Sequence, residues 1–202
     1  MPNNNQTCFT PLQRSLGWCQ GTPVLPGIRR RLYYTSKANI VSWPILEKNN
    51  YRPTGAQYEY GFALKADTYW HYIDILADKS TLTSDPQGEA PSQTQLNKLT
   101  AVHPGVGPEA TALAAYLNNS DNVFIVQDMS GNWRVVGSAY YETKTTVAQD
   151  NGQGATGTPS TTISVEATDV VPAPFYEGTI STEEGELSLQ PGDSPSVITP
   201  GP

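Results

Sequence analysis

Two glycine-rich segments have the spacing of a dinucleotide-binding fingerprint, in which glycines let the backbone approach a pyrophosphate at a helix N-terminus. Gly105 and Gly107 precede a helical pattern, whereas residues 152–157 (GQGATG) precede none. The fingerprint also requires a buried strand before its first glycine and a parallel βαβ unit. Residues 99–104 (LTAVHP) are too short and end in proline, and Glu109 would place a carboxylate against the phosphates. We therefore expect no nucleotide site, and we interpret residues 152–157 as a flexible loop.

Acid–base or metal chemistry would depend on His71 and His103, the two histidines of the chain. His71 falls in a strand-like run and His103 stands before a proline, and neither has a local partner in a pattern typical of a general base or a metal site. The chain has no G-x-S-x-G, H-E-x-x-H or phosphate-loop motif. We expect a strand-face residue and a turn residue, no enzyme activity, no cofactor and no metal.

The cysteines and the acidic cluster near the C-terminus also give no clear indication of a chemical site. Cys8 and Cys19 are the only two cysteines in 202 residues, which is too few for a disulfide framework. We expect two free thiols in a reducing compartment. Glu183, Glu184 and Glu186 could in principle ligate a metal, but a solvated acidic tail is the simpler interpretation.

Arg29, Arg30 and Arg31 form the only basic cluster. Side chains alternate along a strand, so Arg30 should face opposite to Arg29 and Arg31, and the three cannot form one flat patch. A DNA contact is one interpretation. We favour pairing with carboxylates across a subunit boundary, which suits an acidic protein that assembles with itself.

The composition excludes several classes of protein. The 12 basic and 19 acidic residues leave a formal net charge of −7, which opposes attraction to nucleic acid or to an anionic membrane. No apolar run approaches the roughly 18 residues of a membrane span, and the first twenty residues do not resemble a signal peptide. We expect a soluble protein made in a cytoplasm, with no membrane anchor.

The elements that would position these residues are mostly short strands. Strand-like runs cover residues 28–34, 40–43, 62–67, 69–76, 122–128, 133–136, 140–147, 161–167 and 175–180. The first two runs suggest a hairpin, and residues 122–136 give the strongest hairpin signal because a short turn with Gly131 joins two apolar strands. We expect residues 47–60 to be a polar link and residues 79–94 a long exposed loop.

One segment predicts a helix. Gly107-Pro108-Glu109 is followed by ATALAAYLNN. Proline fits the first helical position and a carboxylate suits the first turn. Leu113, Tyr116 and Leu117 fall at i, i+3 and i+4, so they give the helix one apolar face for packing on a sheet.

The fold class expected is mainly β, a β-sandwich or barrel of about eight to nine strands with one flanking α-helix. Residues 27–180 would form this domain. Residues 1–26 are polar and broken by prolines, and residues 181–202 are acidic and rich in proline, so both are expected to be terminal arms. We expect the arms to order on assembly, with Trp18 and Leu25 as docking anchors on a neighbour.

Several segments together resemble the tail tube (major tail) proteins of long-tailed bacteriophages. NVFIVQDMSGNWRVVGS (residues 122–138), reached through a helix ending AAYLNN, is similar to a hairpin of that family. ATGTPSTTISVEATDVVPAPFYEGTI (residues 155–180) is similar to a family strand that ends in a proline-marked turn. GIRRRLYYTSKANIVSWP (residues 27–44) resembles the opening strands of structural proteins from phages of Bacteroidetes. The resemblance covers roughly residues 17–180.

The resemblance implies a β-sandwich protomer, homo-hexameric rings stacked into a hollow tube, and a lumen lined by a β-barrel built from strands of all six subunits. Its partners would be other copies of itself and other phage tail proteins, and its location the virion tail after assembly in the host cytoplasm. Viral DNA would pass without specific binding, and we expect a polar, net negative lumen.

Three alternatives stay open. A head decoration or capsid-associated protein would share the composition and the arms. A carbohydrate-binding module would use exposed aromatic faces, for which Trp18, Trp43, Trp70 and Trp133 are candidates. Hydrolysis by dispersed residues is the weakest alternative.

Overall fold

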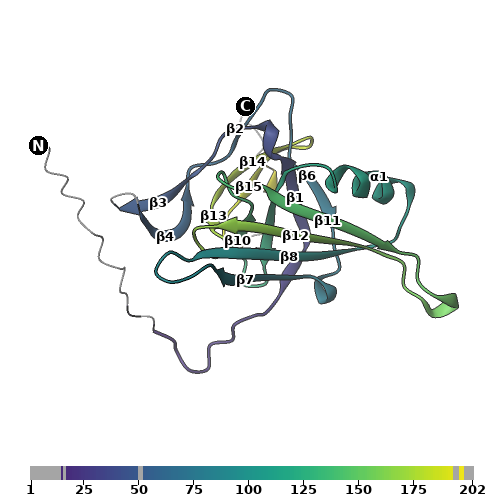
Figure 1. Ribbon diagram of the computed structural model, residues 1–202, viewed down its shortest axis with the longest axis horizontal. Helices are drawn as coiled ribbons and strands as arrows, with labels where there is room; N and C mark the ends of the chain where they lie inside the picture. The colour runs from purple at the N-terminus through teal and green to yellow at the C-terminus, as the bar shows by residue number, and fades with distance from the viewer. Residues whose placement is uncertain (1–14, 16, 50–51, 193–195, 198–202) are drawn as a thin grey trace, which may run out of the picture.

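The computed structural model describes residues 15, 17–49, 52–192 and 196–197, which contain one α-helix and sixteen strands (Figure 1). The largest sheet has seven strands in the order β3-β4-β13-β10-β9-β1-β6. Their bounds are β1 (Ile28–Ser36), β3 (Ile45–Asn49), β4 (Arg52–Glu59), β6 (His71–Asp74), β9 (Asn122–Asp128), β10 (Trp133–Val136) and β13 (Phe175–Tyr176). Neighbours run antiparallel except β4 and β13.

A four-stranded antiparallel sheet packs on one face of the seven-stranded sheet. Its order is β11-β12-β8-β7. The strands are β7 (Thr81–Gln87), β8 (Thr94–Pro104), β11 (Thr143–Asp150) and β12 (Ser160–Asp169). Leu99, Ile163 and Val165 of this sheet share a buried cluster with Leu32 and Phe124 of the larger one. The described strands close no barrel, so the mainly β, sandwich-like fold with a flanking helix is confirmed.

A second core lies on the opposite face of the seven-stranded sheet. It is covered by β14 (Gly178–Thr182), β15 (Gly185–Leu189) and β16 (Ser196–Val197), and by the pair β2 (Ile40–Ser42) and β5 (Ala63–Leu64). Val123 and Ile125 of β9 contribute to this core, whereas Phe124 and Val126 contribute to the first. Because β9 is buried on both faces, its residues 123–126 (VFIV) are continuously apolar instead of alternating.

The helix α1 (Pro108–Leu117) begins and ends as expected from its sequence. Pro108 and Glu109 occupy its first turn after the extended Gly107. Leu117 is fully buried in the first core and Leu113 packs against it, so α1 flanks the sandwich beside β11. Neither α1 nor any other helix in the described residues has the length and apolar character to span a membrane.

The hairpin of β9 and β10 is confirmed, with their strands in antiparallel register. At its turn Asp128 Oδ1 accepts the backbone N–H of Asn132 at 2.9 Å. Gly131 has φ +95°, and a Cβ there would lie 2.6 Å from the backbone of Gly192. Only glycine meets both conditions without strain. The strands β11 and β12 are also confirmed. β12 is slightly longer than predicted, and β11 begins and ends three residues later than predicted.

The predicted hairpin between residues 28–34 and 40–43 is wrong. β1 pairs with β6 and β9, and β2 pairs with β5. A short 3-10 turn (Lys37–Asn39) separates β1 from β2, which then belong to different sheets. The tertiary pairing of β1 with the apolar β9 overrides the local turn signal, since it buries both faces of β1.

Two segments expected to lack regular structure are strands. The polar link over residues 47–60 contains β4 and the end of its partner β3, and the expected loop over residues 79–94 contains β7. β7 is an edge strand with only one half-buried apolar side chain, Leu82, so its sequence carries little apolar alternation. These segments raise the strand count well above the expected eight to nine.

The predicted C-terminal arm over residues 181–202 is wrong for residues 181–189. β14 and β15 form a hairpin in which Leu187 and Leu189 enter the second core, while Glu184 and Glu186 are exposed. The acidic composition suggested a solvated tail. However, polar and apolar residues alternate in the sequence E-L-S-L after Gly185, which is the pattern of a half-buried strand. The remaining part of this arm falls largely outside the described residues.

Candidate functional site

The outer face of the four-stranded sheet is a broad surface of small hydroxyl side chains. Along β12, Ile163, Val165 and Ala167 are buried, and the intervening Ser164 and Glu166 point outward. One row across the strands consists of Thr146, Ser164, Thr100 and Thr81. Short hydroxyl side chains leave such a face smooth and polar.

Charges on this face nearly balance. The row beside the hydroxyl row contains Lys144, Glu166 and Lys98 in cross-strand register, with alternating sign. Lys98 Nζ also lies 3.0 Å from Asp85 Oδ2 of β7. With Asp150 at the far end of β11, the outward positions of the four strands have three carboxylates and two ammonium groups. The surface is polar and slightly acidic.

The edge at β11 is closed by side chains from the segment that follows α1. Asn118 Oδ1 accepts the N–H of Val147 at 2.7 Å, and Asn118 Nδ2 donates to the Val147 carbonyl at 3.3 Å. Asp121 Oδ1 accepts the N–H of Thr143 at 2.9 Å. The Asn118 amide thus takes the place of a strand at the position where another chain could pair.

Replacing Asn118 by alanine should therefore reopen the β11 edge. The two lost hydrogen bonds should lower the free energy of unfolding by about 1–3 kcal/mol, at roughly 0.5–1.5 kcal/mol each. Denaturant titration would measure this loss. Asn119→Ala is the matched control, because Asn119 bonds only its own helix. Equal losses in the two variants would contradict the capping role.

The edge at β7 remains open. Backbone groups alternate in direction along antiparallel strands. The N–H of Val147 in β11 points away from β12, toward Asn118. When this alternation is traced through the paired residues of β12 and β8 to β7, the N–H and C=O groups of Leu82 and Ser84 point away from β8. Neither residue makes a backbone hydrogen bond to another element of the described structure. The backbone of Pro86 has the same outward orientation. Its lack of an N–H therefore costs no hydrogen bond between β7 and β8.

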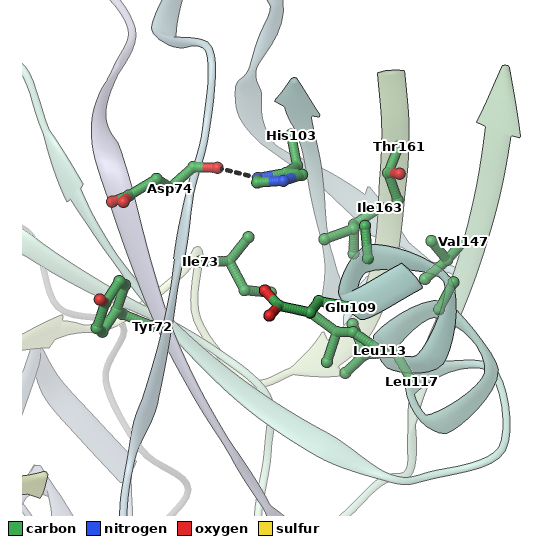
Figure 2. Close-up of a pocket in the computed structure, with 12 residues that line it drawn as sticks. Tyr72, Ile73, Asp74, His103, Glu109, Leu113, Leu117, Val147, Thr161 and Ile163 are labelled. Atoms are coloured by element: carbon green, nitrogen blue, oxygen red, sulfur yellow. Dashed lines mark hydrogen bonds between the residues drawn. The ribbon is translucent and has the colours of Figure 1, made fainter. Parts of the chain in front are cut away.

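A cavity of about 320 Å³ lies between α1 and the two large sheets (Figure 2). Its floor is apolar and includes Ile73, Leu113, Leu117 and Ile163. Glu109 extends from the first turn of α1 toward Ile73. The cavity therefore combines an apolar floor with an acidic group at its rim.

The polar rim of this cavity is not arranged for catalysis. His103 Nδ1 donates to the backbone carbonyl of Asp74 at 2.8 Å, which fixes the imidazole (Figure 2). Thr161 Oγ1 donates to the carbonyl of Gly105 at 2.8 Å, so it has no general base as a partner. No group of three or more potential metal ligands occurs in the described part of the chain. The cavity is suited to binding apolar groups.

The structure assigns different places to the two histidines. His71 lies on β6 and is exposed, with Nδ1 3.8 Å from a carboxylate oxygen of Glu183. His103 lies inside β8, which runs to Pro104, so the predicted turn position is wrong. The glycines at 105 and 107 do follow a long strand and precede α1. However, β8 and the next strand, β9, belong to different sheets, which is not the parallel βαβ unit of a nucleotide site.

Arg31 finds its carboxylate partner within the chain. Its guanidinium contacts Asp74 at 2.7 and 3.2 Å and lies 4.0 Å from the centre of the Tyr72 ring. The hydrogen bond to Asp74 raises the pKa of Arg31. Pairing across a subunit boundary is thus not needed for Arg31. Arg29 and Arg30 make no ion pair with the described residues, and a bulge interrupts regular pairing between Ile28 and Leu32.

The predicted docking anchors are exposed. Trp18 is 70 % and Leu25 57 % exposed, and every described residue from 15 to 27 is exposed. Cys19 is a free, exposed thiol as expected, and Cys8 lies outside the described residues. Neither the arm nor the arginine cluster lines the cavity beside α1.

Asp169, at the end of β12, is a buried carboxyl group that no motif indicated. The residue is 3 % exposed. Its Oδ1 accepts the N–H of Val170 at 2.7 Å, and Oδ2 has no hydrogen-bond partner among the described residues. Burial raises the pKa of Asp169 to about 6. It lines a cavity of about 280 Å³ with Trp43 and Tyr58.

No protein-family model matches this chain, and the searches of curated proteins and of solved structures found no match either. Its function is therefore inferred from the surfaces described above.

Proposed function

We propose that this protein is a virion structural protein, the subunit of a phage tail tube, in which closed rings of identical copies, most simply six, stack into a DNA conduit. The observation that supports this function best is the four-stranded sheet. It has a smooth, hydroxyl-rich outer face and one open edge, and a helix flanks its opposite edge. In the proposed tube this outer face lines the lumen.

The composition of that face suits a conduit. Duplex DNA has one negative charge per roughly 1.7 Å of its axis, and a basic lining would bind it through release of counterions. Two lysines offset by three carboxylates give the DNA no net attraction. Thr and Ser side chains are too short to wedge between bases or to grip the phosphates with charge.

The open edge suits lateral assembly. Unpaired strand edges are a common route to association between chains, and soluble monomers usually block them. Here β11 is blocked by Asn118 and β7 is open, so the two edges differ. A contact between β7 and a different surface of the next copy is heterologous, which permits a closed ring.

Electron microscopy of the purified protein tests the proposal. Rings or hollow tubes are expected. Monomers or trimers that attach to capsids would favour a head decoration protein instead. Mass photometry showing only monomer at micromolar concentration, together with no tubes in virions, would contradict the assembly.

If the outer face of the four-stranded sheet lines the lumen, positive charge added to this face should make the tube bind DNA. The double variant Thr100→Lys and Thr146→Lys adds two ammonium groups to the outer sheet face, so assembled tubes should retain duplex DNA at moderate salt, with affinity that falls steeply as salt rises. Retention of labelled DNA during gel filtration is the measurement. Ala112→Lys with Ala115→Lys adds the same charge on the exposed side of α1. Equal retention by both variants would place the DNA path elsewhere.

The carbohydrate-binding alternative loses most of its candidate side chains. Trp70 is 1 % and Trp133 2 % exposed, so both belong to the second core. Trp43 packs edge-on against Phe62, with 5.3 Å between ring centres. Of the four tryptophans only Trp18 has a largely free face. A glycan array would test what remains of this alternative.

A further inference from the structure

The described part of the N-terminal arm exposes large apolar side chains. Trp18, Val24 and Leu25 are 70, 73 and 57 % exposed. The described part of the arm leaves the body at the start of β1 and runs away from α1 (Figure 1). Large apolar side chains gathered in this way on an extended segment indicate an interaction surface.

The cavity beside α1 has the complementary features. Its volume is about 320 Å³, and its floor is formed by aliphatic side chains. It is open at the rim, where Glu109 provides a carboxylate (Figure 2). One bulky aromatic side chain would cover Ile73 and Leu113.

The charges of the two surfaces also match. Residues 1–27 contain no acidic residue, and their one charged side chain is Arg14. The Asp74 carboxylate points away from the cavity and pairs with Arg31, whereas Glu109 at the rim makes no ion pair with the described residues. Pro23 and Pro26 restrict the arm, which lowers the entropy lost when it becomes ordered.

We propose that the N-terminal arm of one copy docks in the α1 cavity of a second copy, with Trp18 as the main anchor and Leu25 as the second. This inference rests on the proposed self-assembly and names one contact within it. Docking in a second copy is favoured over docking in the same copy because the described part of the arm extends away from the cavity of its own subunit.

Cysteine cross-linking tests the contact in the full-length chain, because Cys19 follows the anchor Trp18. The donor has Cys8→Ser and keeps Cys19. The receptor has Cys8→Ser, Cys19→Ser and Glu109→Cys at the cavity rim. After the two are mixed and mildly oxidised, a donor–receptor disulfide is expected at least about tenfold faster than with a control receptor that has Lys79→Cys, an exposed site away from the cavity. Trp18→Ala in the donor should reduce the rate by at least about tenfold, the size of an anchor effect.

Several outcomes would overturn the proposal. These are equal rates for the two receptors, a rate unchanged by both Trp18→Ala and Leu25→Ala, or an intrachain disulfide as the main product when Cys19 and Glu109→Cys share one chain. Electron microscopy of the same samples separates this proposal from the tube. Tubes without the cross-link would refute only the arm contact, and cross-linked copies without rings or tubes would refute only the tube.

Discussion

Replacing Ser84 by proline should abolish tube assembly while the subunit remains folded. The N–H of Ser84 points outward from the open edge of β7, where a neighbouring strand would accept it. Proline removes this donor and places ring atoms at the contact. Edge strands tolerate proline in outward positions, and Pro86 already occupies one in β7. Loss of rings and tubes in micrographs, and a shift to monomer in mass photometry, are the expected results.

The matched control is Ser84→Ala. Ser84 Oγ donates to Asn97 Oδ1 at 2.6 Å, and both substitutions remove this bond. Alanine keeps the backbone N–H, so only the proline variant tests the edge. Thermal melts of both variants would show whether the sandwich is intact. If folded Ser84→Pro protein assembles as readily as Ser84→Ala protein, β7 does not mediate the ring contact.

Asp169 should make the subunit more stable at mildly acidic pH than at neutral pH. Its pKa rises from an ordinary 3.8 to about 6 because burial disfavours the carboxylate. A carboxyl whose pKa is raised by folding contributes stability that is complete below about pH 3.8 and is lost as the pH rises through about 6. At about 1.4 kcal/mol per pKa unit, the whole effect is about 3 kcal/mol.

The measurable part lies between pH 7.5 and 5, where ordinary carboxyl groups stay largely ionised. Over this interval Asp169 should add about 1.4 kcal/mol to the free energy of unfolding. Asp169→Asn keeps an oxygen for the N–H of Val170 but cannot ionise, so it should lack this gain. All other ionisable groups are common to the two proteins, so the difference between wild type and variant isolates Asp169. Parallel pH profiles from denaturant titrations would show that Asp169 does not titrate in this range.

The part of the candidate site that could be predicted from sequence was limited to exposed anchors. Trp18 and Leu25 stood out as apolar residues in a polar, proline-rich segment, and both are exposed. The hydroxyl-rich sheet face was not predictable, because β7 has the composition of a loop. Asp169 gave no signal either, since burial of a carboxyl depends on which segments cover it.

The sequence by itself determined the elements that are encoded locally. Pro108 and Glu109 define the start of α1, and the Gly131 turn defines the hairpin of β9 and β10. These signals act within a few residues, where backbone dihedrals and caps set the conformation. Alternating residues likewise predicted β11 and β12, and the mainly β class followed from these elements together.

The tertiary structure decided which strands pair and which surfaces remain open. β1 selects β9 and β6, distant in the chain, over its neighbour β2, because pairing there buries both of its faces. The same long-range packing draws Leu187 and Leu189 into the second core and leaves Glu186 outside. Asn118 closes the edge of β11, and β7 remains open, only because α1 lies at one side of the sheet. Local sequence cannot specify such contacts, since their free energy comes from residues that meet only in the folded chain.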